Sequence, residues 1–380
     1  MTQTLTFDAV SEALPGPKWK ARWDRSWPAY EGWFVAKGGD AGPDRAASIA
    51  ALQEHMPELV ETHAALTELA GGSDRAAQFL AAWCPPTYLG GCSLIAMADR
   101  GSVRLVRNYD LSPDLNEGLM LHTAWTGRRV MGMVEFLWGL SDGINDAGLS
   151  VALAYGGGSR TGRGFGICLI LRYVLETCTT VAEAVAVLER IPSHMDYNLV
   201  LADRTGDTAS IEMIAGGGIR KMPHAHATNH QHGDTAPARP EFTKTHERYA
   251  HLEALTGGEA TTPSTLAEQF LQSPLFQTNH AQGFGTLFTA EYDPAACTMA
   301  LHWPTDTWTQ SMDAFVEGSR TVNYDTASSE TYDWVAALRP WIGEAADTLY
   351  APDGTQDWVA FGMAFANGGV GTLPSQSANR

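Results

Sequence analysis

The chain has 380 residues, of which 44% are hydrophobic, so it can bury a large core and is not disordered. Its 43 acidic residues outnumber 25 basic ones and give a formal net charge of −18, which argues against a nucleic-acid backbone or an anionic membrane as partner. No apolar run reaches the roughly 20 residues of a membrane helix, and no basic-then-apolar leader is present, so a cytoplasmic protein is expected.

The first 91 residues are predicted to be mainly helical. Apolar residues at helical spacing predict a long amphipathic helix over residues 45–69, which Pro57 kinks or breaks. A second helix is expected over residues 75–83, before a Pro-Pro pair stops it. The helical segment then runs through a loop into Gly91.

From Cys92 onward the hydrophobic period changes to two, which indicates strands. Strands are expected over residues 93–98, 102–107, 130–137, 149–155, 197–203, 208–214, 219–222, 225–228, 285–292 and 297–302. Helices are expected over residues 166–177, 181–190, 242–255, 263–272 and 330–349, and a Gly/Ser-rich tail over residues 364–380. This order favours an α+β protein in which two sheets pack face to face with helices outside, rather than a doubly wound parallel sheet.

Cys92 follows two glycines and opens a predicted strand pair. A glycine before the cysteine leaves its own carbonyl open to attack by the cysteine side chain. Attack of the Cys92 thiol on the Gly91 carbonyl would give a thioester that water hydrolyses, leaving an amine with a pKa of about 7.7–8.0 beside the thiol. The pattern therefore predicts cleavage between Gly91 and Cys92, with Cys92 as nucleophile and its new amine as base. The alternative is a buried structural cysteine at the start of a strand.

Arg107 and Asp110 come at the end of the same predicted strand pair. In a tight hairpin the start of one strand lies beside the end of its partner, so both charges are expected near Cys92. An arginine lowers a thiol pKa and can hold a substrate carboxylate or carbonyl, and a carboxylate can orient an amine. The alternative is an ion pair on the surface, which contributes little to stability.

Gly91-Cys92, together with the sequence RNYD at residues 107–110, resembles the penicillin-acyltransferase group of N-terminal-nucleophile hydrolases, which is related to penicillin V acylase and bile-salt hydrolase. Further matches follow in the order of the family. They are SDGINDAGL at residues 141–149, LETCTTVAEA at 175–184, LADRTGD at 201–207, ATNH at 227–230 and TLF at 286–288. The resemblance covers about residues 90–305, and it implies a four-layer αββα sandwich with a helical N-terminal segment.

The resemblance also implies a reaction. Cys92 would be the nucleophile and, through its amine, the general base, while Asp110 would orient that amine and Arg107 would support the thiolate and the substrate. The enzyme would take a small-molecule amide or acyl donor and pass its acyl group through an acyl-Cys92 intermediate to water or an amine. No cofactor and no metal are needed for this chemistry.

Three further positions match residues of the family. The side-chain amide of Asn229 would donate to the oxyanion, and the backbone N–H of Gly156 would be the second donor. Taken alone, Asn229 is typical of a turn. Arg248 lies in the sequence THER at residues 245–248, which resembles a Ser-x-x-Arg pattern with threonine in the place of serine.

Self-cleavage would divide the chain into two parts. A helical α chain would span residues 1–91, and a β chain would hold the αββα catalytic domain over residues 92–350 and a C-terminal tail over residues 351–380. The two chains would stay associated. The sequence leaves open whether the protein forms a homo-oligomer.

Two other functions also stay open on the sequence. One is a non-catalytic relative that binds a small acyl or amide ligand. The other is a metal hydrolase that uses the histidines at positions 224, 226, 230 and 232, because imidazoles at alternate strand positions can share a metal. Exposed loop histidines or substrate contacts are the commoner explanation for such a cluster.

Overall fold

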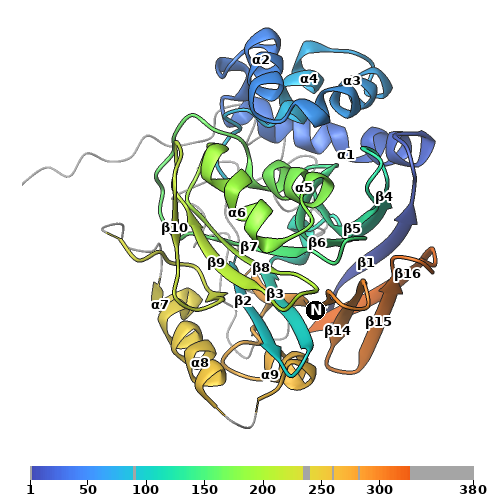
Figure 1. The fold of residues 1–380 in the computed structure, drawn as a ribbon. Coiled ribbons are helices and arrows are strands. Elements are labelled where there is room, and N and C mark those ends of the chain that lie inside the picture. Colours follow the sequence, from blue (N-terminus) through green and yellow to red (C-terminus); the bar gives the residue numbers. More distant parts are fainter. Residues whose placement is uncertain (1, 89–90, 234–239, 259–260, 281–282, 326–380) are drawn as a thin grey trace, which may run out of the picture.

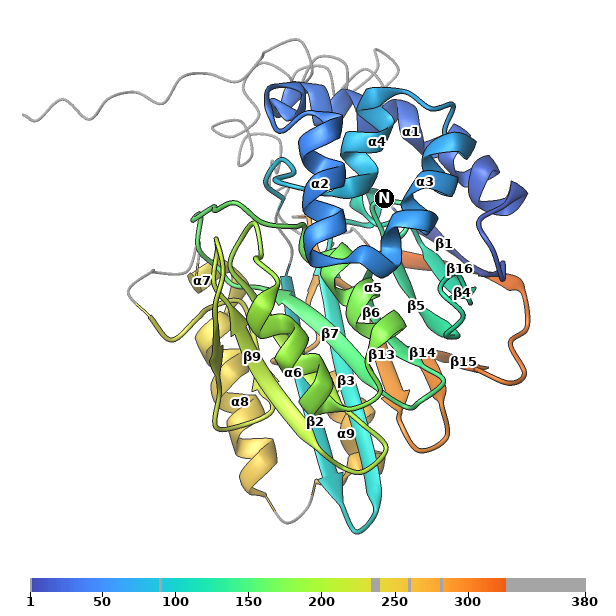
Figure 2. The ribbon, with the colours of Figure 1, turned by 45° about the horizontal axis from the view of Figure 1, so that its top comes forward.

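Two β-sheets pack face to face, and helices cover the outer face of each (Figures 1 and 2). The computed structural model describes residues 2–88, 91–233, 240–258, 261–280 and 283–325. The helix predicted over residues 330–349 and the tail predicted over residues 364–380 lie outside these ranges. Within them, the four-layer αββα arrangement that the sequence predicts is present.

The larger sheet has nine strands in the order β10-β9-β8-β7-β6-β5-β4-β1-β16. Its strands are β1 (Thr2–Ser11), β4 (Leu119–Thr123), β5 (Val130–Glu135), β6 (Gly139–Asn145), β7 (Ser150–Tyr155), β8 (Tyr197–Ala202), β9 (Thr208–Met213), β10 (Ile219–Lys221) and β16 (Gly318–Asp325). Neighbouring strands are antiparallel except β1 and β4, which run parallel. The first strand of the chain therefore lies beside one of the last.

The smaller sheet has the order β11-β2-β3-β13-β14-β15, with β12 paired to β13. Its strands are β2 (Gly91–Asp99), β3 (Ser102–Leu111), β11 (His226–Ala227), β12 (Thr278–Asn279), β13 (Phe284–Asp293), β14 (Thr298–Trp303) and β15 (Asp306–Ser311). The β2–β3 hairpin lies inside this sheet rather than at its edge, and the first six residues of β2 are buried.

The helices form the two outer layers. The larger sheet is covered by α1 (Pro17–Ala36), α2 (Arg45–His55), α3 (Val60–Leu69), α4 (Asp74–Ala81), α5 (Ile167–Thr177) and α6 (Val181–Arg190) (Figure 2). The smaller sheet is covered by α8 (Thr245–Gly257), which α7 (Pro240–Thr243) precedes, and α9 (Leu266–Phe270). None of the helices in the described ranges is long and apolar enough to cross a membrane.

Strand alternation divides the apolar side chains between the layers. On β2, Leu94 faces the core between the two sheets, whereas Ile95 faces the core beneath α8 and α9. On β7, Ala152 faces the core between the sheets, whereas Val151 and Leu153 face the helices. Strands buried on both faces in this way have little polar alternation in their sequence.

The structure confirms one helix prediction and corrects another. The break predicted at Pro57 is present, because α2 ends at His55 and α3 begins at Val60. The prediction that the segment before Cys92 is mainly helical missed β1, which pairs with β4 and β16. The partners of β1 lie more than a hundred residues away along the chain, so no local signal marks its place in the sheet.

Strands β4, β6, β12, β15 and β16 were not predicted either. Residues 141–145, which begin the family match SDGINDAGL, lie in β6. Gly143 on this strand lies opposite Gly132 of β5, and a Cβ on Gly132 would come within 2.9 Å of the Gly143 Cα. The two backbones approach too closely for side chains, so glycine at both positions allows the close pairing of the two strands.

Candidate active site

The β2–β3 hairpin positions Cys92. Its register places Gly91 opposite Asp110, Cys92 opposite Tyr109, and Leu94 opposite Arg107. Because side chains alternate along a strand, Cys92 and Arg107 point between the two sheets, whereas Asp110 points to the outer face beneath α8 and α9. The candidate site therefore has two sides, one that holds the sulfur and one that holds the backbone of Cys92.

On the inner side, a buried arginine holds the sulfur. Arg107 donates from Nη2 to Cys92 Sγ at 3.1 Å, and from Nη1 to Asp142 Oδ1 at 2.5 Å. Asp142 also accepts hydrogen bonds from Ser141 at 2.6 Å and from Tyr292 at 2.7 Å. Arg107 and Asp142 are both fully buried, so their ion pair fixes the direction in which the guanidinium faces the sulfur.

The thiol of Cys92 is not acidic in this uncleaved chain. Burial raises the pKa of the Cys92 thiol to about 11, and the nearby charge of Arg107 offsets only part of that effect. The sequence predicted that an arginine would lower this pKa, but desolvation of a sulfur that is 2% exposed outweighs it. The thiol is therefore protonated at neutral pH and needs a base to become a nucleophile.

On the outer side, Asn229 and Arg248 hold the backbone of Cys92. The Cys92 N–H donates to Asn229 Oδ1 at 3.0 Å, and Arg248 Nη2 donates to the same oxygen at 2.8 Å. Arg248 Nη1 also donates to the Cys92 carbonyl at 2.5 Å and to Ser93 Oγ at 2.8 Å. The Nδ2 of Asn229 donates to the carbonyl of Tyr155 at 3.1 Å. The structure thus brings these two predicted residues to Cys92.

Asp110 reaches Cys92 through Arg248. Its carboxylate lies 3.6 Å from Arg248 Nη1 and accepts a hydrogen bond from Thr286 Oγ1 at 2.7 Å. Burial raises the pKa of the Asp110 carboxyl, although Arg248 and Thr286 act in the opposite direction. Its Oδ2 has no hydrogen-bond partner in the described part of the chain.

Gly156 follows Tyr155 at the end of β7, next to the residue that accepts from Asn229. Its backbone N–H donates to the carbonyl of Asp196 at 3.0 Å. In this structure the N–H is therefore engaged with the chain itself, and it would have to leave Asp196 before it could bind an oxyanion.

The sequence reasoning missed several residues of the site. Asp142 and Thr286 lie within motifs that carried the family resemblance, but neither was assigned a role. Tyr292 is on β13 and reaches across the space between the sheets to Asp142, which is on β6. No sequence signal marks such a contact, because it depends on how one sheet packs on the other.

The histidine cluster lies close to Asn229 but does not form a metal site. Among the residues that the structure describes, no three His, Cys, Asp or Glu side chains come together as metal ligands. His230 shares hydrogen bonds with Thr228 at 3.1 Å and Thr245 at 3.0 Å, and His232 bonds to Glu212 at 2.9 Å. The alternative of a metal hydrolase therefore has no geometric support in the described part of the chain.

The burial of His226 predicts that the free energy of unfolding of the protein decreases in acid. It is 1% exposed, and neither ring nitrogen has a hydrogen-bond partner among the described residues. Burial, together with His224 and His232, lowers its pKa to about 4. The unfolded chain, with a histidine pKa near 6.5, binds the proton first as the pH falls, so His226 contributes a loss of about 2 kcal/mol of unfolding free energy between pH 7.5 and 5.

Urea unfolding at pH 7.5 and pH 5 measures this effect. The variant His226→Phe should lose about 2 kcal/mol less than the wild type over this interval. The control is His302→Phe, because His302 lies on β14 and bonds to Glu291 at 2.8 Å, away from the histidine cluster. Equal losses in the wild type and His226→Phe would contradict the prediction.

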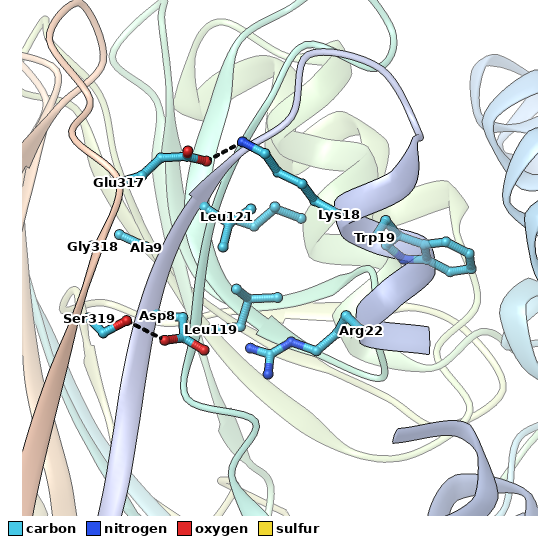
Figure 3. Close-up of a pocket in the computed structure, with 11 residues that line it drawn as sticks. Asp8, Ala9, Lys18, Trp19, Arg22, Leu119, Leu121, Glu317, Gly318 and Ser319 are labelled. Atoms are coloured by element: carbon cyan, nitrogen blue, oxygen red, sulfur yellow. Dashed lines mark hydrogen bonds and ion pairs between the residues drawn. The ribbon is translucent and has the colours of Figure 1, made fainter. Parts of the chain in front are cut away.

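A pocket of about 280 Å³ lies between β1, β4, β16 and the start of α1 (Figure 3). Among its charged side chains, Lys18 pairs with Glu317 at 2.5 Å and Asp8 accepts a hydrogen bond from Ser319 at 2.7 Å (Figure 3), while Arg22 donates to the backbone carbonyl of Glu117 at 3.3 Å. None of the residues described around Cys92 lines this cavity. It is therefore separate from the candidate active site.

The chain matches one known protein family over more than half of its length. The family model of acyl-coenzyme A:6-aminopenicillanic acid acyl-transferase matches residues 97–308. The matched range begins after Cys92 and includes Arg107, Asp110, Asn229 and Arg248. No curated protein sequence matches the chain.

Several solved structures are also similar to it. Penicillin V acylase from Agrobacterium tumefaciens is 17% identical with a TM-score of 0.38, and the match covers 58% of this chain and 86% of that one. A variant of conjugated bile acid hydrolase from Clostridium perfringens is 13% identical with a TM-score of 0.43, over 64% of this chain and 100% of that one. An N-acylethanolamine-hydrolyzing acid amidase ortholog from Caenorhabditis elegans is 16% identical with a TM-score of 0.41, over 61% and 99%.

Proposed function

Because the chain belongs to the acyl-coenzyme A:6-aminopenicillanic acid acyl-transferase family of N-terminal-nucleophile hydrolases, we propose that it cleaves itself before Cys92 and then works as a cysteine amidohydrolase or N-acyltransferase. The acyl group of a small-molecule amide would pass to the Cys92 sulfur and then to water or an amine. One observation carries the proposal: the sulfur lies 3.1 Å from the guanidinium of Arg107, while the backbone nitrogen of the same residue lies 3.0 Å from Asn229 Oδ1.

Self-cleavage begins with attack of Cys92 Sγ on the carbonyl carbon of Gly91. A C–S bond forms, the Gly91–Cys92 C–N bond breaks, and the thiol proton moves to the departing nitrogen. Water then hydrolyses the thioester and leaves a carboxylate on Gly91 and a free amine on Cys92. Glycine suits position 91, since a Cβ there would lie 2.2 Å from the ring of Phe284 and 2.9 Å from the carbonyl oxygen of Asp110.

The free amine supplies the base that the buried thiol lacks. An α-amine has a pKa of about 7.7–8.0, so roughly a tenth of it is unprotonated at pH 7 and can accept the thiol proton. The nitrogen that becomes this amine lies at Asn229 Oδ1. We assign the orientation of the amine to Asn229 and to the Asp110–Arg248 pair, whose guanidinium holds the adjacent Cys92 carbonyl.

During turnover, a negative charge develops on the oxygen of the attacked carbonyl. We assign the side-chain amide of Asn229 as its first donor, and a donor of this kind contributes about 2.7–4 kcal/mol to transition-state binding. Its Nδ2 now donates to Tyr155, so it must exchange this bond for one to the oxyanion. Gly156 is the proposed second donor and must likewise leave Asp196. Arg107 stabilises the thiolate once the proton has moved.

The fold explains how the two proposed chains would stay together. The α chain, residues 1–91, would contribute β1, which lies between β4 and β16 of the β chain. Its helices α1 to α4 share an apolar core with α5 of the β chain. Separation would expose this core and break the pairing of two strands, so the cut should leave one compact particle. It is also part of the proposal that the catalytic domain spans residues 92–350 and that a C-terminal tail spans residues 351–380.

Intact mass spectrometry tests the proposed cleavage and the proposed intermediate together. The purified protein should give two fragments that separate before Cys92 yet elute as one species on size exclusion. Incubation with a panel of N-acyl amino acids, β-lactam amides and β-alanyl amines should add an acyl mass to the fragment that begins with Cys92. A chain that stays intact and still hydrolyses amides would overturn the role of the amine.

One observation favours a second function, a non-catalytic relative that binds an acyl or amide ligand. In the uncleaved chain the sulfur is 2% exposed and its pKa is about 11, so it is unreactive as it stands. The same mass experiment separates the two functions. A protein that never cleaves and never forms an acyl-Cys92 with any member of the panel would support the binding function instead.

A further inference from the structure

Asn198 is a buried asparagine that the proposed mechanism does not use. It lies near the start of β8, opposite Ala154 of β7, and is 2% exposed. Val200, two residues further along the same strand, belongs to the core between the two sheets, so the side chain of Asn198 points toward the smaller sheet. Cys92 belongs to the same core, so Asn198 faces the side of the larger sheet on which the candidate site lies.

The amide nitrogen of Asn198 holds the backbone on both sides of Asn229. Its Nδ2 donates to the carbonyl of Thr228 at 2.8 Å and to the carbonyl of His230 at 2.8 Å. Residues 228–230 follow β11 and belong to no strand, so a strand ladder does not supply partners for these two carbonyls. Asn198 supplies the donor that a neighbouring strand would otherwise supply.

The side chain of Asn229 faces three groups at once. Its Oδ1 accepts from the N–H of Cys92 at 3.0 Å and from Arg248 at 2.8 Å. Its Nδ2 donates to the carbonyl of Tyr155 at 3.1 Å. An amide carries its donor and its acceptor on two arms of one rigid plane, so a shift of the backbone at Asn229 would misdirect all three bonds.

The same end of β8 holds the second proposed oxyanion donor. The backbone N–H of Gly156 donates to the carbonyl of Asp196 at 3.0 Å, and Asp196 precedes Asn198 by two residues. The two proposed donors, Gly156 and Asn229, are therefore both held by residues at one end of one strand. A site that is held by strands of the scaffold is positioned more precisely than a site held by loops alone.

We propose that Asn198 is a positioning residue, which fixes Asn229 so that its side-chain amide can bind the oxyanion of the attacked carbonyl. This inference rests on the proposed acyl transfer through Cys92. Asn198 acts through the backbone carbonyls of residues 228 and 230 and not through the substrate. Its loss should therefore weaken binding of the transition state, in which the oxyanion forms, and leave binding of an uncharged ligand unchanged.

The variant Asn198→Asp tests the inference, because a carboxylate has nearly the same shape as the amide but cannot donate to the two carbonyls. The Oδ1 of Asn198 has no hydrogen-bond partner in the described part of the chain, so these two bonds are the ones that the variant removes. The substrate is the fastest member of the panel of N-acyl amino acids, β-lactam amides and β-alanyl amines. On the cleaved, two-chain protein, kcat/KM per Cys92 that accepts an acyl mass should fall by about tenfold or more.

An aldehyde with the carbon skeleton of that acyl group gives a readout that a merely structural role would not move. The Cys92 sulfur adds to the aldehyde carbon, the C=O double bond becomes a single bond, and the thiol proton passes to the oxygen, which lies where the oxyanion forms. The inhibition constant of the aldehyde should rise in Asn198→Asp by the same factor by which kcat/KM falls. The inhibition constant of the corresponding alcohol, which forms no adduct, should stay within about threefold.

The matched control is Asn145→Asp. Asn145 is also buried, and its Nδ2 donates to the carbonyls of Leu175 and Cys178, both at 2.8 Å, where α5 ends. The control loses two bonds of the same kind and length, so its free energy of unfolding in urea should fall by a similar amount. It should nevertheless keep the wild-type kcat/KM per acylated site. An equal loss of kcat/KM in both variants would show that Asn198 serves the fold alone.

The outcomes separate this inference from the proposed function. If Asn198→Asp keeps the wild-type kcat/KM and aldehyde affinity, the role of Asn198 is overturned and the proposed function stands. If kcat/KM falls but the aldehyde binds as before, Asn198 acts on another step and the inference fails. If no member of the panel acylates Cys92 in the wild type, the proposed function and this inference fail together.

A crystal structure of the wild-type aldehyde adduct decides the matter even if Asn198→Asp does not fold or cleave. Asn198 should keep its bonds to the carbonyls of residues 228 and 230, while Asn229 Nδ2 exchanges the carbonyl of Tyr155 for the oxygen of the adduct. An adduct in which Asn198 has released either carbonyl, or in which Asn229 does not reach the oxygen, would overturn the inference.

Discussion

Replacing Cys92 by alanine is expected to leave a single uncleaved chain of 41.0 kDa that does not turn over amides. Alanine has no sulfur to attack the Gly91 carbonyl, so neither the thioester nor the free amine can form. The loss in kcat should exceed about 10⁴-fold, because nucleophile and base disappear together. Intact mass spectrometry reads the cleavage, and hydrolysis of the panel of amides reads the turnover.

The fold should survive this substitution. The Cys92 sulfur accepts a hydrogen bond from Arg107, and the backbone bonds to Asn229 and Arg248 do not depend on the side chain. The matched control is Cys178→Ala, because Cys178 is also buried but its sulfur contacts Thr177 at the end of α5. The control should cleave and turn over normally. Full amide hydrolysis by Cys92→Ala would show that the nucleophile is another residue.

The part of the site that the sequence predicted best is the part with local contacts. Gly91 to Asp110 form one tight hairpin, so the strand pattern alone brought Arg107 close to Cys92. The alternation of the same strands also implies that Asp110 points to the other face, a consequence that the sequence reasoning did not draw. The sequence therefore predicted which residues gather but not which side of the sheet each of them serves.

The thiol pKa shows why the electrostatics could not be predicted. The sequence contains the arginine, and an arginine beside a thiol favours the thiolate. Whether that effect prevails depends on how deeply the sulfur is buried, and this depth results from the packing of two sheets and two layers of helices. Here burial prevails and the pKa of the Cys92 thiol rises to about 11.

Two of the strands that the sequence missed, β1 and β16, have a similar explanation. β1 and β16 pair over most of their length, although they stand at opposite ends of the described chain. Long-range pairing leaves no local turn signal, whereas the hairpins β2–β3, β8–β9 and β13–β14 are linked by short segments and were all predicted. Long-range pairing therefore accounts for the failure to predict β1 and β16, but not for β6 and β15, which pair with their neighbours along the chain.

Arg107→Met is expected to lower the free energy of unfolding by about 3–5 kcal/mol and to stop both cleavage and turnover. The guanidinium is fully buried and pairs with Asp142, so its removal leaves a buried carboxylate without its cation. It also leaves Cys92 Sγ without its donor, and the thiolate then has no positive charge beside it. Urea unfolding and intact mass spectrometry measure the two effects on the same preparation.

A second substitution separates the structural loss from the catalytic one. In the double variant Arg107→Met/Asp142→Asn the buried charge is gone. The introduced asparagine can accept a hydrogen bond from Ser141 on its amide oxygen and donate one from its amide nitrogen to the Tyr292 hydroxyl, so most of the lost stability should return. Cleavage and turnover should not return, because the guanidinium that would stabilise the thiolate is still missing. Recovery of activity together with stability would mean that Arg107 serves the fold alone, whereas a stable double variant that stays inactive ties Arg107 to the chemistry of the sulfur.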